Sequence, residues 1–208
     1  ASRVLEPLAS AIRTTGASRV LIGHPRGEEA QTLVAFVGSL GYEAEAVYTG
    51  RRLAELAMSG ADYELILISD AIDAPPLADL VQWLRKDYRT AGIPVGIMAR
   101  SEDLQAHRDA FAADPLTTVF PRLYSTEVAA REVARVVASA GRNYVANEER
   151  LAQAPSSLAA IARLAESPEG FALWNLPRQE TALIEGLDNP ALSAAAAGGL
   201  GRLGTSSS

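Results

Sequence analysis

The sequence contains no cysteine among its 208 residues. Disulfide bonds, thiolate metal sites and cysteine nucleophiles are therefore excluded. Histidine is nearly as scarce: His24 and His107 are the only two, too few for a site built from several histidines. No apolar run approaches the roughly 18–20 residues that a membrane-spanning helix requires. We therefore expect no metal, no other cofactor and no membrane partner.

Positive charge is also limited, with 19 Lys and Arg against 25 Asp and Glu and a net charge of −6. Binding to a nucleic-acid backbone requires concentrated Lys and Arg, so we expect no nucleic-acid partner. The chain opens with Ala-Ser-Arg instead of Met and closes with Gly-Thr-Ser-Ser-Ser. We interpret both ends as truncated. The lack of cysteine favours the cytoplasm, although a targeting signal in a longer parent protein would change that assignment.

Five short apolar segments predict β-strands, and the third and fourth are almost continuously apolar. Strands of that kind are typical of parallel sheets covered by helices on both faces. The segments that separate them have helical periodicity: Ala30, Leu33, Val34 and Val37, for example, form one stripe. This alternation predicts a doubly wound α/β domain over residues 17–140. The predicted strands are residues 19–23, 43–48, 64–69, 94–98 and 117–120.

The flanking segments are predicted to be helical. Residues 1–16 indicate a short helix ended by Gly16, and residues 141–208 form a helical extension whose first part, 142–153, continues the preceding helix past Gly141. Residues 178–204 resemble one HEAT-type helical hairpin. A single repeat cannot bury its own faces, so we interpret it as the first repeat of a longer array, with an ordinary helical appendage as the alternative.

Between these helices, Phe171 and Trp174 lie in a proline-flanked aromatic segment. We interpret them as anchoring one domain against another, with a docking surface as the alternative.

The sequence LRKDYRTAGIPVGIM at residues 84–98 resembles the passage from the third helix to the fourth strand in response-regulator receiver domains. Residues 19–57 are similar to the opening of the same family, including the Leu-Gly-Tyr-Glu entry to the second strand. The resemblance covers about residues 19–140. It implies a flavodoxin-like fold with sheet order 2-1-3-4-5 and a pocket at the carboxyl ends of the strands.

The resemblance also implies a phosphorylation site, which this sequence has lost. Receiver domains use two acidic residues to hold Mg²⁺, an Asp as phosphoacceptor, a Thr or Ser, and a Lys; the cation and the lysine offset charge during phosphoryl transfer. The lysine position is followed here by Arg122. The positions that match the five catalytic groups are occupied by His24, Pro25, Ser69, Ala99 and Pro121.

Two residues leave alternatives open. Asp70 directly follows Ser69, and a longer third strand would present it as the acceptor, although still without the Mg²⁺ ligands and the lysine. His24 is either a polar loop residue, which we favour, or a ligand for an anion or metal. Glu28 and Glu29 are interpreted as partners of a helix dipole.

The sequence therefore predicts a degenerate pseudo-receiver that is neither an enzyme nor phosphorylated. We expect it to act as a protein-interaction or scaffolding module within a larger helical-repeat protein. The resemblance implies a homodimer through the last helices as one form of partner. The alternative is a sensor that binds a small anion or metabolite in the remodelled pocket, where Arg122 supplies the charge that the lysine no longer does.

Overall fold

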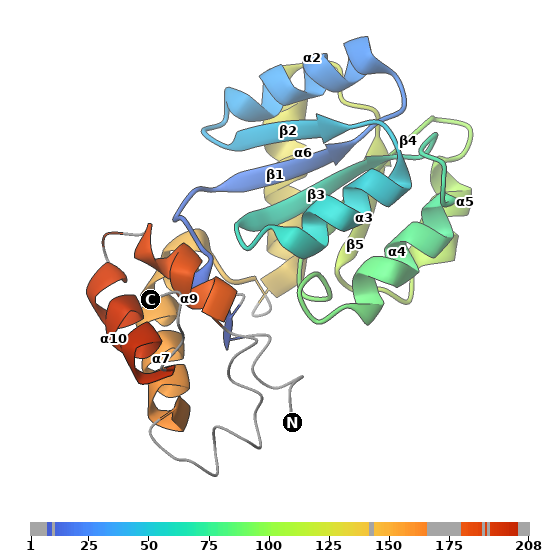
Figure 1. Ribbon diagram of the computed structural model, residues 1–208. Helices are drawn as coiled ribbons and strands as arrows, with labels where there is room; N and C mark the ends of the chain where they lie inside the picture. Colours follow the sequence, from blue (N-terminus) through green and yellow to red (C-terminus); the bar gives the residue numbers. More distant parts are fainter. Residues whose placement is uncertain are drawn as a thin grey trace. The chain divides into compact units, whose positions relative to one another are not determined.

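The computed structural model describes residues 8–9, 11–141, 144–165, 180–188, 190 and 192–203 (Figure 1). It divides into two compact units. One is Ala17–Ala146, and the other combines Ala1–Gly16 with Asn147–Ser208. Each unit has its own hydrophobic core.

The larger unit is built on a five-stranded parallel sheet with the order β2-β1-β3-β4-β5. This confirms the predicted doubly wound fold and its strand order. Each strand lies within one residue of its predicted bounds, because an apolar segment between two helical periods leaves little freedom in where a strand begins or ends. The strands are β1 (Arg19–Gly23), β2 (Glu43–Val47), β3 (Tyr63–Ser69), β4 (Val95–Ala99) and β5 (Thr117–Pro121).

Helices cover both faces of this sheet (Figure 1). Two of them, α2 and α6, pack on one face, and α3, α4 and α5 pack on the other. The predicted stripe of α2 is confirmed in part, since Ala30, Leu33 and Val37 are buried. The helices are α2 (Gly27–Gly38), α3 (Gly50–Ser59), α4 (Leu77–Lys86), α5 (Leu104–Phe111) and α6 (Thr126–Ala140).

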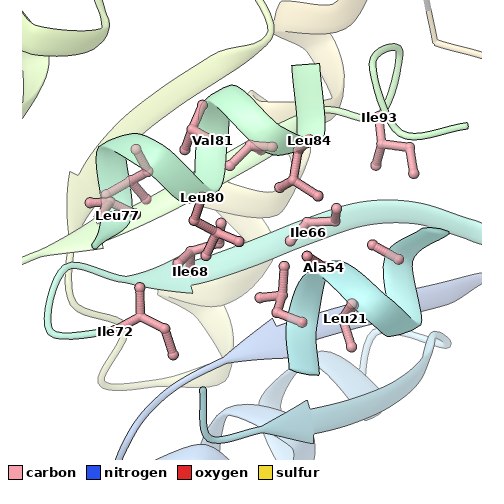
Figure 2. Close-up of a cluster of buried hydrophobic side chains, with 14 of the residues drawn as sticks. Leu21, Ala54, Ile66, Ile68, Ile72, Leu77, Leu80, Val81, Leu84 and Ile93 are labelled. Atoms are coloured by element: carbon pink, nitrogen blue, oxygen red, sulfur yellow. The ribbon is translucent and has the colours of Figure 1, made fainter. Parts of the chain in front are cut away.

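The central strand β3 is buried at every position. Its side chains alternate between the two cores. Ile66 and Ile68 face α3 and α4. Leu80 and Leu84 of α4 pack against them (Figure 2). Leu65 belongs to the core on the side of α2 and α6. An uninterrupted apolar run is therefore what this position in the fold requires.

Arg85 ties the end of α4 to the amino ends of β4 and β5. Its side chain is only 19% exposed, and its Nε donates to Asp114 at 2.8 Å. A guanidinium has five N–H groups, and here each has an acceptor. Burial would by itself raise the pKa of Asp114, but its bonds from Thr117 and Arg85 outweigh that effect and lower it. The remaining acceptors of Arg85 are the carbonyls of Ala91, Ile93 and Leu116 and the hydroxyl of Thr117.

The smaller unit is helical. Residues 8, 9, 11 and 12 are helical, and α7 (Asn147–Ala165), α9 (Glu180–Leu187) and α10 (Ser193–Leu203) follow. Ile12 packs among the core residues of these later helices. Leu8 and Ile12, among the described residues before Gly16, thus share a core with the C-terminal helices. That core consists of Ile12, Ala154, Leu158, Ile161, Leu183, Leu192, Ala196 and Leu200.

The prediction that the preceding helix continues past Gly141 is wrong. The helix α6 ends at Ala140, and Gly141 takes a φ of +50°, a left-handed conformation that favours glycine. A new helix begins at Asn147 and runs through Pro155 without ending. Proline removes one helical hydrogen bond. The helix tolerates this loss because the buried Ala154 and Leu158 on either side of it anchor it to the core.

The predicted hairpin at 178–204 is present as α9 and α10, which pack on each other and, through α10, on α7. Gly186 on α9 allows close packing, since a Cβ there would lie only 3.1 Å from Ile12 Cγ2. Its HEAT-type character stays a prediction. Phe171 and Trp174 lie outside the described residues. None of the described helices combines the length and hydropathy needed to span a bilayer.

We expect Arg85→Lys to lower the free energy of unfolding by about 2–4 kcal/mol, because a lysine cannot reproduce the forked donors and leaves buried carbonyls without partners. Urea unfolding of the full chain would measure this change. The matched control is Arg52→Lys, in an exposed pair with Glu55, which should change stability by less than about 0.5 kcal/mol. Equal losses in the two variants would contradict the role assigned to Arg85.

Candidate functional site

Polar side chains gather at the carboxyl edge of the sheet, where the ends of parallel strands meet. His24 follows β1, and Ser69 and Asp70 lie at the end of β3. Arg100 follows β4 and Arg122 follows β5. Residues far apart in the sequence thus form one constellation because the strand order places β1, β3, β4 and β5 side by side.

Asp70 lies at the centre of this constellation. Its side chain is only 1% exposed. The carboxylate accepts the backbone N–H of Arg100 at 2.8 Å and Nη2 of Arg122 at 3.2 Å, and Nε of Arg100 lies 3.5 Å away. We call Asp70, Arg100 and Arg122 the charge lock. It joins the carboxyl ends of β3, β4 and β5.

The charge lock keeps Asp70 ionised. Burial alone would raise its pKa, since a low dielectric disfavours the charged form. The hydrogen bonds from the Arg100 backbone and the Arg122 side chain, together with the two positive charges, outweigh that effect. The pKa of Asp70 is therefore below its ordinary value.

His24 extends the network on the side of β1. It is a polar residue of the loop that follows β1, and it is only 4% exposed. Its Nδ1 lies 3.2 Å from both the backbone nitrogen and the carbonyl oxygen of Arg26, and its Nε2 lies 3.2 Å from Glu29 Oε2. Glu29 in turn lies 3.7 Å from Nη1 of Arg122. His24 is thus linked to the charge lock through Glu29.

Glu29 has specific partners, which the helix-dipole interpretation did not include. Its carboxylate accepts Nη1 of Arg26 at 2.7 Å. That hydrogen bond is the main reason that the pKa of Glu29 is lowered, and the charges of His24, Arg26 and Arg122 act in the same direction.

Ser69 is fully buried as the last residue of β3. Its Oγ accepts the Ala71 N–H at 3.2 Å, so it stabilises the turn that follows the strand. Neither histidine forms a hydrogen bond with it within the described part of the chain. A serine nucleophile requires such a base.

The remaining predicted positions contribute no polar side chain. Pro25 and Pro121 are exposed, and Ala99 is buried in the core that faces α3 and α4. Of the seven predicted pocket residues, the structure therefore brings together His24, Ser69, Asp70 and Arg122. Glu29 and Arg100 also belong to this site, but they were not predicted as site residues from the sequence. Arg100 directly follows a strand, as Arg122 does, so its position at a strand end could have predicted it.

A cavity of about 150 Å³ lies beside these residues. Arg122 takes part in its wall, and the Nε atom of Arg122 is buried with no hydrogen-bond partner among the residues that the structure describes. The cavity is lined by His24, Glu29, Thr32, Leu33, Ser69, Met98, Arg122 and Leu123.

No protein-family model matches this sequence, and no curated protein matches it. Solved structures do match. A sensor protein from Polaromonas sp. JS666 is 15% identical with a TM-score of 0.52, covering 59% of this chain and 98% of that one. A chemotaxis response regulator of Vibrio cholerae is 16% identical with a TM-score of 0.52, covering 58% and 98%.

The receiver domain of a sensor histidine kinase from Pseudomonas aeruginosa PAO1, with a magnesium ion in its active site cleft, is 17% identical. Its TM-score is 0.50, and the match covers 57% of this chain and 96% of that domain. These similarities establish that the chain has a receiver-like fold.

The site residues do not fit the Mg²⁺ that receiver domains hold. The ion prefers several oxygen ligands. Asp70 is engaged by two arginines, His24 by Glu29, and Pro25 offers no ligand atom. Within the described ranges, no three His, Asp or Glu side chains form a group that would hold a metal.

We expect Asp70→Asn to lower the free energy of unfolding at pH 7 by about 1–3 kcal/mol, because it leaves two arginines facing a neutral amide. Since the pKa of Asp70 is lower in the folded than in the unfolded protein, its stabilising effect is present above the unfolded value of about 3.9. That effect is lost as the pH falls through the folded value. The difference between the two proteins should therefore shrink in acid.

Urea unfolding from pH 7 down to pH 3 would test this. The matched control is Asp109→Asn, on exposed α5, which keeps an oxygen to accept the hydrogen bond from Gln105. A stability difference for Asp70→Asn that stays constant with pH would show that its charge is not what stabilises the fold.

Proposed function

We propose that this chain is a non-catalytic pseudo-receiver. It acts as a protein-interaction or scaffolding module within a larger helical-repeat protein, and it is not phosphorylated. The observation that carries this proposal is the charge lock, in which the Asp70 carboxylate, next to the phosphoacceptor position, is buried and paired with two arginines.

Phosphorylation would require Asp70 to leave both arginines and attack a phosphoryl donor. In a receiver, a bound cation and a lysine offset the charge that develops during this transfer. Here the lysine position is Pro121, and the residues at the end of β1 do not fit a divalent cation. The Asp70 carboxylate is therefore paired with arginines, and the cation and lysine that would assist its attack have no counterpart at these positions. The same reasoning weighs against any phosphatase or kinase activity.

The surface of the larger unit supports a protein partner. Trp83 on α4 and Tyr88 just after it are 44% and 45% exposed. The guanidinium of Arg89 stacks over the Tyr88 ring at 5.6 Å. Tyr, Trp and Arg are the residues that most often dominate binding energy at protein interfaces. Self-association through the last helices, α5 and α6, remains part of the proposal.

The helical unit supports a repeat array. On α9, Ile184 and Leu187 are 44% and 39% exposed, although this helix also contributes Leu183 to the core. In repeat proteins, an apolar outer face of this kind is covered by the neighbouring repeat. We therefore propose that α9 and α10 form a HEAT-like repeat that packs against a further one.

Acetyl phosphate with Mg²⁺ should leave the mass of the full chain unchanged, because the charge lock holds Asp70. Intact-mass spectrometry would measure this, with a phosphorylation-competent receiver domain in the same mixture as the positive control. A gain of one phosphoryl group that maps to Asp70 would overturn the proposal.

The interaction role is tested by a photo-crosslinking residue placed at position 83 and expressed in the native host. We expect a defined adduct that Tyr88→Ala weakens severalfold, since both side chains would contact the same partner. The control places the crosslinker at exposed Arg51 on α3. Equal adducts from both positions, or none from position 83, would contradict a partner surface at α4.

A further inference from the structure

The cavity beside the charge lock has the size of a small ligand. It encloses about 150 Å³ between α2, the ends of β3 and β4, and the segment after β5. An apolar cavity of roughly that volume in another protein accommodates a molecule the size of benzene. The cavity here therefore suits a ligand of about six non-hydrogen atoms.

Most of its wall is apolar. Leu33 from α2, Met98 from β4 and Leu123 after β5 line it, and each of them is at least nine-tenths buried. A bound molecule would bury aliphatic groups against these side chains, which favours binding. The ligand should therefore carry a small hydrocarbon part.

Two hydrogen-bond donors belong to residues of the cavity wall. The Arg122 Nε–H is buried and has no acceptor among the described residues. A buried donor without a partner lowers stability. Ser69 accepts a hydrogen bond from Ala71, which leaves its own hydroxyl proton for another acceptor. Both groups favour a ligand that presents an oxygen acceptor.

The charges around the cavity disfavour an anion. Arg122 is already paired with Asp70 at 3.2 Å, and Glu29, which lines the cavity, lies 3.7 Å from the same guanidinium. A ligand carboxylate near Glu29 would be repelled, and Arg122 is already shared between Glu29 and Asp70. An uncharged carbonyl is not repelled by Glu29. A cationic ligand would be repelled by Arg122.

We propose that this cavity binds a small uncharged molecule with a carbonyl or amide oxygen, held by Arg122 and Ser69 and packed against Leu33, Met98 and Leu123. The inference goes beyond the proposed interaction role and does not depend on it. A failure of the ligand test would leave the phosphorylation and crosslinking results unaffected.

The test uses the chain's two methionines. Met98 lines the cavity, whereas Met58 on α3 packs against the core on the opposite face of the sheet. With the methionine methyl groups labelled with ¹³C, the full chain is titrated with isobutyramide, which has the expected size and an uncharged acceptor. We expect a saturable shift of the Met98 signal with a Kd of about 1–10 mM, while Met58 stays unchanged.

Isobutyrate is the matched control ligand, because it has the same shape and a negative charge. It should bind at least about tenfold more weakly, since it meets the repulsion from Glu29. A saturable Met98 shift with isobutyrate but not isobutyramide would identify an anion site and overturn the proposal. No saturable Met98 shift with isobutyramide, or equal shifts at Met58, would also overturn it.

Two variants test the donors. Arg122→Gln should weaken isobutyramide binding by about tenfold, and Ser69→Ala should weaken it by several-fold with little change of shape. If Arg122→Gln does not fold, Ser69→Ala alone decides the question. Unchanged affinity in the folded variants would show that neither group holds the ligand.

Discussion

The burial of β3 is the constraint on which the larger unit depends. A strand that is apolar on both faces must be covered by helices on both sides, and parallel strands connected through helices satisfy that demand. Because helices cover both faces of the sheet, the polar side chains that form ion pairs lie at its two ends. The ion pairs at the amino end, around Arg85, and at the carboxyl end, around Asp70, follow from this division of space.

The two ends use the same chemistry in different ways. At the amino end, every N–H of Arg85 has an acceptor, so the group is fully satisfied and serves the fold alone. At the carboxyl end, Arg122 pairs with Asp70 but keeps a buried N–H without a partner beside a cavity. A network that is satisfied rigidifies a protein, whereas one with a spare donor can recognise another molecule. The carboxyl end is therefore the end of the sheet at which we propose ligand binding.

Much of this arrangement could be predicted from the sequence. Strand positions and their order follow from apolar runs and from the resemblance of residues 84–98, and the gathering of His24, Ser69, Asp70 and Arg122 follows from the strand ends. The partners of those residues could not be predicted, because the direction of a long side chain depends on packing that one sequence does not reveal.

Contacts between distant residues also determine the secondary structure of the helical unit, and one sequence does not reveal them. The helix α7 runs through Pro155 because of contacts with residues distant in the sequence. Local propensity carries no information about such contacts.

The double pairing of Asp70 has an evolutionary consequence. Because one carboxylate takes bonds from two arginines on different strand ends, the loss of either arginine leaves the other, and the backbone N–H of Arg100, in place. We expect the double substitution to lower stability by more than the sum of the two single ones, which is a case of negative epistasis. A lineage can therefore drift at one arginine while the other becomes indispensable. A free carboxylate at position 70 would require the loss of both arginine pairings.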